Sequence, residues 1–285
     1  MLDISEYHGR LTRTSITEDR ADRVDFVEEG AGPLVVLVHS SMSGARQWSA
    51  LIRDLKDFSL VRAVNLFGYG NTPAWSKVES PSLDDYAELV ARAVPHTADH
   101  VSLVGHSFGG AVAMQAAARQ LRGRVKKLVL IEPSLFYLLD YCGRRKVYGE
   151  ILKLSKCTKR HIADGIPEAA AERFIDYWGG PGTWAASPSD RQASFTRSMA
   201  LLPYEWDAVL QGEATPAEWR TALPQDTLVI SSANTPRPSR ELVEVLLQAC
   251  PAWEFASIFD GGHMAPLTHP QIVNPIIKGF LASRR

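Results

Sequence analysis

Short apolar runs alternate along this chain with longer segments in which apolar residues recur every three or four positions. The runs are rich in Val, Leu and Ile, which is typical of strands buried on both faces of a parallel sheet. They lie at 34–38, 59–64, 101–104, 125–131, 226–231 and 253–259. The segments between them predict helices with one apolar stripe, at 46–55, 83–94, 111–118, 240–249 and 265–281. This alternation predicts an α/β fold with a mostly parallel sheet and right-handed crossovers.

The N-terminal region has a different pattern. Residues 7–17 and 23–28 alternate polar and apolar side chains, which predicts a hairpin-like pair of strands at one edge of the sheet. Residues 30–33 predict a turn into the first buried strand. Together with the six apolar runs, the two edge strands bring the expected sheet to eight strands.

The alternation of strands and helices stops at Ser134, and no strand pattern returns before about Thr221. Helical spacing is found instead at 144–159, 167–177 and 190–202, and the block holds almost half of the chain's aromatic residues. Such a helical insertion over the strand ends predicts a cap on an active site, with some aromatic side chains lining a hydrophobic pocket. We therefore expect a core in two pieces, 1–133 and 222–285, and a cap at 134–221. Basic residues on one face of 144–159 predict a solvated helix surface; attraction of anionic substrates is the alternative.

Composition narrows the class of protein. The chain has 285 residues, and 31 Lys and Arg against 32 Asp and Glu give a net charge of −1. This length suits one large α/β domain with an inserted subdomain, and the charge does not favour nucleic acid or an anionic membrane as partner. Three widely spaced cysteines predict neither a disulfide framework nor a metal site. Without an apolar signal segment near residue 1, a cytoplasmic protein is expected.

The sequence VSLVGHSFGG at 101–110 joins a buried strand to a helix through Gly-x-Ser-x-Gly. Strand, tight turn and helix in this order form a nucleophile elbow, which lifts the Ser107 hydroxyl off the end of the strand. The turn is strained, and bulky side chains two residues away would clash, which explains Gly105 and Gly109. Ser107 is therefore the candidate nucleophile.

Five segments resemble the core of the α/β-hydrolase family in order and spacing. They are VDFVEEGAGPLVVLVHS at 24–40, NLFGYGNT at 65–72, VSLVGHSFGG at 101–110, VKKLVLIEP at 125–133 and DGGHMAPLTHPQIVNPIIKGFL at 260–281. The resemblance implies a mostly parallel eight-stranded sheet flanked by helices, with the helical insertion as a cap. It also implies a triad of serine, acid and histidine in that chain order.

His263 stands where the family has its catalytic base. It follows a strand and two glycines, which let the loop fold inward so that the imidazole reaches the serine. A serine hydroxyl needs such a base to take its proton. Among the other histidines, His39 is expected to hydrogen-bond backbone, and His106, beside the nucleophile, to support the site without reacting.

An oxyanion hole requires two preorganised N–H donors. Phe108, at the start of the helix after the elbow, is expected to supply one. Ser41, in the loop after 34–38, is expected to supply the other. Here the chain has His39-Ser40-Ser41 in place of the usual His-Gly. Either Ser40 adopts a conformation that glycine often supplies, or the loop has another shape. The alternative interpretation is that these residues form an ordinary turn rich in small polar side chains.

The acid of the triad is not where the family usually has it. After the strand expected at 226–231 the chain reads SSANTP, and Asn234 or Thr235 can orient an imidazole but cannot stabilise its charge. Glu132 ends the strand after the elbow helix, a position that some family members use, and it is the favoured candidate. An ordinary strand-end role for Glu132 is the alternative. Two weaker candidates are Asp207 and Asp260.

These residues predict a serine hydrolase that cleaves a carboxylic ester of a small hydrophobic substrate through an acyl-enzyme, without cofactor or metal. Thioesterases, lactonases, carbon–carbon bond hydrolases, haloperoxidases and perhydrolases would use the same triad. Epoxide hydrolases and haloalkane dehalogenases resemble this fold but carry a carboxylate at the elbow. The alternative of another class is a non-catalytic, ligand-sensing protein, which the missing carboxylate at the usual position favours.

Overall fold

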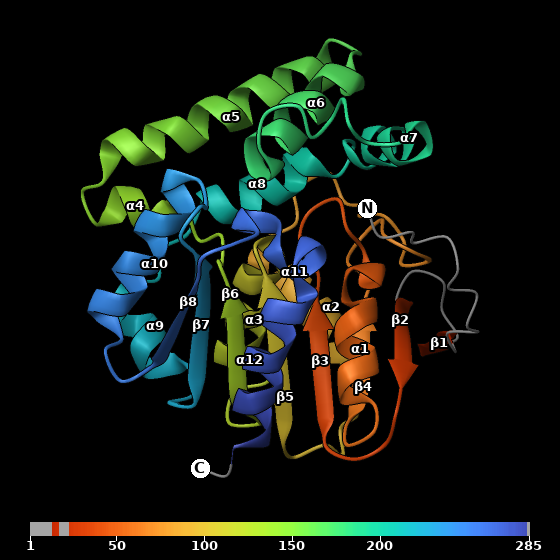
Figure 1. Ribbon diagram of the computed structural model, residues 1–285, viewed down its shortest axis with the longest axis vertical. Helices are drawn as coiled ribbons and strands as arrows, with labels where there is room; N and C mark the ends of the chain where they lie inside the picture. Colours follow the sequence, from red (N-terminus) through yellow and green to blue (C-terminus); the bar gives the residue numbers. More distant parts are fainter. Residues whose placement is uncertain (1–12, 17–22, 284–285) are drawn as a thin grey trace.

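The computed structural model, shown in Figure 1, describes residues 13–16 and 23–283. Within these residues a single eight-stranded sheet has the order β1-β2-β4-β3-β5-β6-β7-β8. Its strands are β1 (Arg13–Ile16), β2 (Val24–Glu29), β3 (Leu34–Val38), β4 (Leu60–Val64), β5 (Val101–His106), β6 (Val125–Ile131), β7 (Thr227–Ser232) and β8 (Glu254–Ile258). β1 and β2 pair antiparallel, as do β2 and β4, and all other pairs are parallel. The predicted mostly parallel α/β sheet is confirmed; of the strand expected at 7–17, residues 7–12 and 17 lie outside the described part.

The continuous apolar run of β3 is explained by burial on both sides of the sheet. Leu34, Val36 and Val38 belong to the core on one side, whereas Val35 and Leu37 belong to the core on the other. Successive strand side chains point to opposite faces, so a strand between two layers of helices needs an apolar residue at every position.

Helices cover both faces of the sheet (Figure 1). The 3₁₀ turn η2 (Ala45–Trp48), α1 (Ser49–Leu55) and α12 (Pro270–Ala282) pack on one face, and α2 (Leu83–Arg92), α3 (Phe108–Ala118) and α10 (Arg237–Ala249) on the other. The helix predicted at 265–281 is divided into α11 (Ala265–Thr268) and α12. The division falls at His269, whose φ of −134° and ψ of 49° are not helical. A residue before proline is disfavoured in the helical region, and His269 precedes Pro270.

Residues 134–226, all of which are described, contain helices and no strand. The helices are α4 (Tyr137–Tyr141), α5 (Arg145–Ala163), α6 (Pro167–Gly179), α7 (Ser189–Ser198), α8 (Leu202–Leu210) and α9 (Pro216–Ala222). In Figure 1, α5 to α8 lie across the end of the sheet toward which β3 and β5 run. α9 instead packs against α3 and α10 beside the sheet. The boundaries 134 and 221 stay a prediction.

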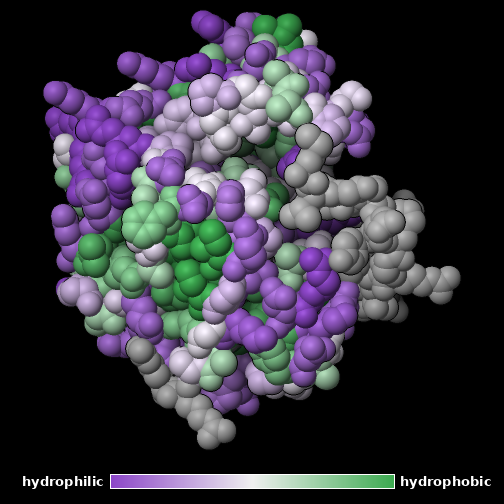
Figure 2. Space-filling model, in the orientation of Figure 1, coloured by the Kyte–Doolittle hydropathy of each residue, from purple (hydrophilic) through white to green (hydrophobic). Residues whose placement is uncertain are grey.

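The surface separates polar and apolar areas. On α5, Val147, Ile151 and Leu154 are buried, and the exposed face carries Lys146, Lys153, Lys156 and Arg160. Figure 2 shows apolar side chains gathered over α12 and β8. The hydrophobic residues of these two elements that are only partly buried include Ala256, Ile272, Ile276 and Leu281. No helix in the described part of the chain combines the length and the apolar character needed to cross a bilayer.

Candidate active site

Ser107 lies at the turn between β5 and α3 in a backbone conformation that is rare for a residue with a side chain. Its φ is 54° and its ψ is −119°. A Cβ on Gly105 would lie 2.4 Å from the carbonyl oxygen of Gly109, and one on Gly109 would lie 2.3 Å from the carbonyl oxygen of His39. Both glycines are therefore required by the close approach of backbone segments, as the sequence predicted.

A continuous chain of hydrogen bonds joins three side chains that are distant in the sequence. The Ser107 hydroxyl donates to Nε2 of His263 over 2.9 Å. Nδ1 of His263 donates to Oε2 of Glu132 over 2.6 Å. His263 and Glu132 are buried, and the Trp178 ring lies 4.3 Å from the imidazole, centroid to centroid. This serine–histidine–carboxylate arrangement is the geometry by which a hydroxyl becomes a nucleophile.

Glu132 is held in place by β7 and the loop that follows it. It directly follows β6 with a φ of 44°, and its Oε1 accepts a hydrogen bond of 2.7 Å from the Ser232 amide. Its Oε2 accepts a further bond from the Thr235 hydroxyl. Thr235 thus occupies the usual position of the acid and supports the carboxylate that lies on the neighbouring strand. Asn234 instead donates to the carbonyl of Phe259 over 2.8 Å.

The two weaker candidates for the acid lie away from the imidazole. Asp207 forms an ion pair with Lys159 and accepts a hydrogen bond of 3.0 Å from Ser80. Asp260 is exposed in the loop before His263. Neither bonds to His263, so the carboxylate that faces Nδ1 is Glu132.

Ser41 and Phe108, the two expected oxyanion donors, both line the pocket beside Ser107. Neither amide donates a hydrogen bond within the described residues, so both remain available to a ligand. Ser40 does not take the left-handed conformation; in this loop Met42 does, with a φ of 66°. The Met42 amide donates to the Tyr69 hydroxyl over 2.9 Å, which stabilises this turn. Near the nucleophile, the Ser134 hydroxyl lies 3.1 Å from that of Ser107.

Two buried histidines support the loops around the site, as expected for His39 and His106. Burial lowers the pKa of His39 to about 4, and it holds the pKa of His106 well below its usual value, with a further contribution from nearby His263. Nε2 of His106 donates to the carbonyl of His263 over 2.9 Å, and its Nδ1 accepts from Gln47 over 3.1 Å. Gln47 in turn accepts from the Ser40 amide over 2.9 Å. Neutral His106 therefore links the loop after β3 to the His263 loop.

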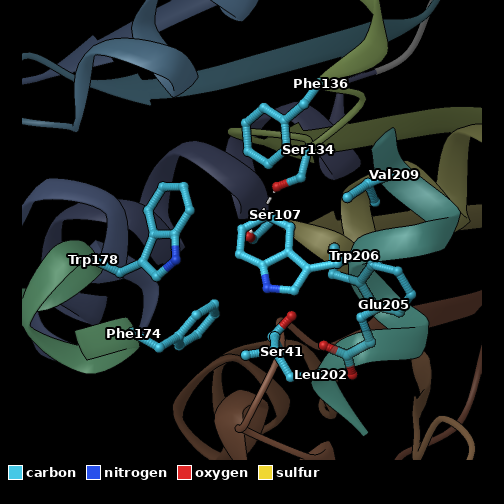
Figure 3. A pocket seen from close by; sticks show the side chains of 11 residues that line it. Ser41, Ser107, Ser134, Phe136, Phe174, Trp178, Leu202, Glu205, Trp206 and Val209 are labelled. Atoms are coloured by element: carbon cyan, nitrogen blue, oxygen red, sulfur yellow. Dashed lines mark hydrogen bonds between the residues drawn. The ribbon is translucent and has the colours of Figure 1, made fainter. Parts of the chain in front are cut away.

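A pocket of about 280 Å³, part of it open to solvent, adjoins Ser107. Figure 3 shows Phe174 and Trp178 of α6 on one side of the pocket. Glu205, Trp206 and Val209 of α8 lie on the other side. The remaining lining residues are Ser41, Phe108, Ser134, Phe136 and Leu202. The pocket is therefore mainly apolar and aromatic, with hydroxyls at its base and one carboxyl in its wall.

Glu205 is a pocket residue that sequence reasoning missed, as it missed Ser134. Glu205 is 2% exposed, and burial raises the pKa of its carboxyl to about 7, while the hydroxyls of Ser41 and Tyr69 act in the opposite direction. The Tyr69 hydroxyl donates to Oε1 over 2.8 Å. The signal in the sequence was a charged residue one position before Trp206 on an otherwise apolar helix face.

Within the described residues, no group of three His, Cys, Asp or Glu side chains is arranged to hold a metal ion. The polar groups at the site are therefore the hydroxyls, imidazoles, amides and carboxyls already described. Their arrangement is suited to acyl transfer, which needs a nucleophile, a base and oxyanion donors.

Known proteins resemble this chain in sequence and in fold. A model of the α/β-hydrolase family matches residues 35–276. The chain is 40% identical to a pimeloyl-[acyl-carrier protein] methyl ester esterase of Aeromonas hydrophila, over 88% of this chain and 96% of that protein. It is 29% identical to the lipase LipV of Mycobacterium tuberculosis, over 89% and 95%.

Solved structures resemble most of the chain. A hydrolase from Pseudomonas aeruginosa has a TM-score of 0.76 at 17% identity and covers 97% of this chain and 100% of its own. The naproxen esterase of Bacillus subtilis has a TM-score of 0.70 at 17% identity, with 95% and 92% covered. At this identity the likeness concerns the fold, whereas the family model extends over most of the sequence. This chain belongs to the α/β-hydrolase family.

Proposed function

We propose that the protein is a serine hydrolase that cleaves carboxylic esters of small hydrophobic substrates through an acyl-enzyme intermediate. The observation that carries the proposal is the hydrogen-bonded chain from Ser107 through His263 to Glu132, with distances of 2.9 Å and 2.6 Å. The Glu132 carboxylate on Nδ1 supports turnover over the alternative of a ligand-sensing protein, which the absence of an acid at Asn234 and Thr235 had favoured.

In the proposed acylation step, Ser107 Oγ attacks the ester carbonyl while Nε2 of His263 takes the hydroxyl proton. The amides of Ser41 and Phe108 hold the negative oxygen of the tetrahedral intermediate. Glu132 keeps Nδ1 protonated and stabilises the imidazolium. When the intermediate collapses, the carbon–oxygen bond to the alcohol breaks and His263 returns the proton to the leaving oxygen.

Deacylation repeats these steps with water. His263 takes a proton from water as the water oxygen attacks the acyl carbon, and the new intermediate releases the acid and restores the Ser107 hydroxyl. The same donors hold the oxyanion in both halves of the reaction. No step requires a metal or a cofactor.

The substrate class follows from the pocket and from the relatives. Phe136, Phe174, Trp178 and Trp206 line the space beside the nucleophile, which favours a hydrophobic acyl or alcohol group. The lipase and the methyl ester esterase among the relatives act on esters by their names, which supports the same bond class here. Thioesterase, lactonase, perhydrolase and carbon–carbon bond hydrolase activities would use the same side chains and are outcomes of the substrate test.

The test combines a covalent probe with a substrate panel. A fluorophosphonate should label the wild-type protein and not Ser107→Ala, whereas Ser194→Ala, an exposed serine of α7, should label normally. p-Nitrophenyl esters, acyl thioesters and lactones, assayed on the same samples, should show the highest kcat/KM for an ester. A folded wild-type protein that is not labelled, or labelling that survives in Ser107→Ala, would contradict the proposal.

A further inference from the structure

Glu205 carries a carboxyl group in a buried position, where burial of such a group costs free energy. It projects from α8, whose other pocket residues are Leu202, Trp206 and Val209, into a mainly apolar cavity. Burying a carboxyl group is unfavourable unless its oxygens find partners. An aliphatic residue at this position would fill the wall without that cost, so the polar atoms of Glu205 need an explanation beyond packing.

The two oxygens of Glu205 have different surroundings. Oε1 accepts the hydrogen bond of 2.8 Å from Tyr69, whose hydroxyl is fixed by the Met42 amide. Oε2 is buried and forms no hydrogen bond of ordinary geometry within the described residues, while the Ser41 hydroxyl lies close enough to the carboxyl to lower its pKa. Figure 3 shows the carboxyl turned toward Ser41. One oxygen is thus anchored, and the other is left for a group that enters the pocket.

We propose that Glu205 is a specificity-determining residue whose Oε2 hydrogen-bonds a hydroxyl group on the acyl part of the substrate, close to the scissile carbonyl. The inference deepens the proposed ester hydrolase and rests on it. The acyl part is indicated by Ser41, because the same residue offers its amide to the carbonyl oxygen and its side chain to the neighbourhood of Glu205. A hydroxyl near the carbonyl carbon would therefore face the carboxyl.

A hydroxyl fits this carboxyl better than an ammonium group does. Because the pKa of Glu205 is about 7, both protonation states are populated near neutral pH. A hydroxyl donates to the ionised form and accepts from the protonated form, whereas an ammonium group bonds only to the ionised form. An ammonium group would also have to leave water for a mainly apolar pocket.

The first experiment measures substrate preference. p-Nitrophenyl butyrate is compared with its 2-, 3- and 4-hydroxy analogues and with the 3-ammonium analogue. We expect the wild-type protein to prefer at least one hydroxy ester about tenfold in kcat/KM, since sites built to bond a hydroxyl discriminate against analogues that lack it. Glu205→Leu should lose the preference, and Glu205→Gln should retain most of it, because an amide can bond a hydroxyl in either sense.

The second experiment makes the inference independent of turnover. Ser107→Ala, alone and combined with Glu205→Leu, is titrated calorimetrically with butyl butyrate and with the preferred butyl hydroxybutyrate. Tighter binding of the hydroxy ester only when Glu205 is present supports the assignment. Equal binding of the two esters to Ser107→Ala, or a preference that survives in Glu205→Leu, overturns it. A preference for the ammonium ester that Glu205→Gln abolishes also overturns it, in favour of charge recognition.

The two proposals fail in different ways. If the wild-type protein hydrolyses p-nitrophenyl butyrate and is labelled at Ser107 but shows no hydroxyl preference, only the role of Glu205 is wrong. If it neither hydrolyses esters nor is labelled, the hydrolase proposal is wrong, and calorimetry still decides whether Glu205 binds a hydroxyl.

Discussion

Replacing Glu205 by glutamine measures the cost of its buried charge while keeping the shape of the side chain. The pKa of this carboxyl rises from 4.5 to about 7 because burial disfavours the ionised form. Each pKa unit corresponds to about 1.4 kcal/mol. Ionisation of Glu205 should therefore lower the free energy of unfolding by about 3 kcal/mol at a pH above both values.

The direction of the effect follows from proton binding. Between pH 4.5 and about 7 the folded chain holds a proton on Glu205 that the unfolded chain has lost. The stability contributed by this group is thus fully present below pH 4.5 and falls as the pH rises through about 7. Glutamine does not titrate, so the advantage of Glu205→Gln over the parent should grow by about 2 to 3 kcal/mol between pH 5 and pH 8.

Urea unfolding at several pH values, followed by circular dichroism, measures this difference. Glu213→Gln is the matched control, since Glu213 is exposed in the segment that follows α8 and its substitution should leave the pH dependence of the parent unchanged. If the free energies of unfolding of Glu205→Gln and the parent differ by the same amount at every pH, the carboxyl is not desolvated in the folded protein and the reasoning fails.

Three further substitutions test the site and the elbow. Glu132→Gln should lower kcat by roughly 10⁴-fold without changing the circular dichroism spectrum, because the imidazolium loses its charge partner; a loss within about tenfold would reject Glu132 as the acid. Gly109→Ala puts a Cβ 2.3 Å and 2.4 Å from two carbonyl oxygens and should cost more than about 2 kcal/mol in denaturant titration; an unchanged midpoint would show that the elbow can relax. Gly149→Ala, inside α5 with nothing within 4 Å of the new Cβ, should instead raise the free energy of unfolding by up to about 1 kcal/mol; a decrease would contradict this.

The local pattern of apolar residues predicted most of the fold, because a strand that is buried on both faces is apolar at nearly every position. The run at 34–38 matches β3 at both ends, and the run at 125–131 matches β6. The strand expected at 101–104 is longer, since Gly105 and His106 continue the ladder against Leu130 and Ile131 of β6. Glycine and histidine are weak signals for a strand, and only their pairing with a neighbouring strand includes them.

The amino-acid sequence by itself determined the order of the elements and the elbow around Ser107, because these depend on residues that are close together in the chain. The candidates His263 and Glu132 came from the resemblance of the sequence to the family. Tertiary structure alone decided that the Glu132 carboxylate, 131 positions from His263, faces its Nδ1. It also decided that Thr235 supports this carboxylate and that Glu205 enters the pocket from α8. Such contacts join elements whose relative placement is set by packing over the whole core. The pattern of apolar and polar residues within one segment does not specify them.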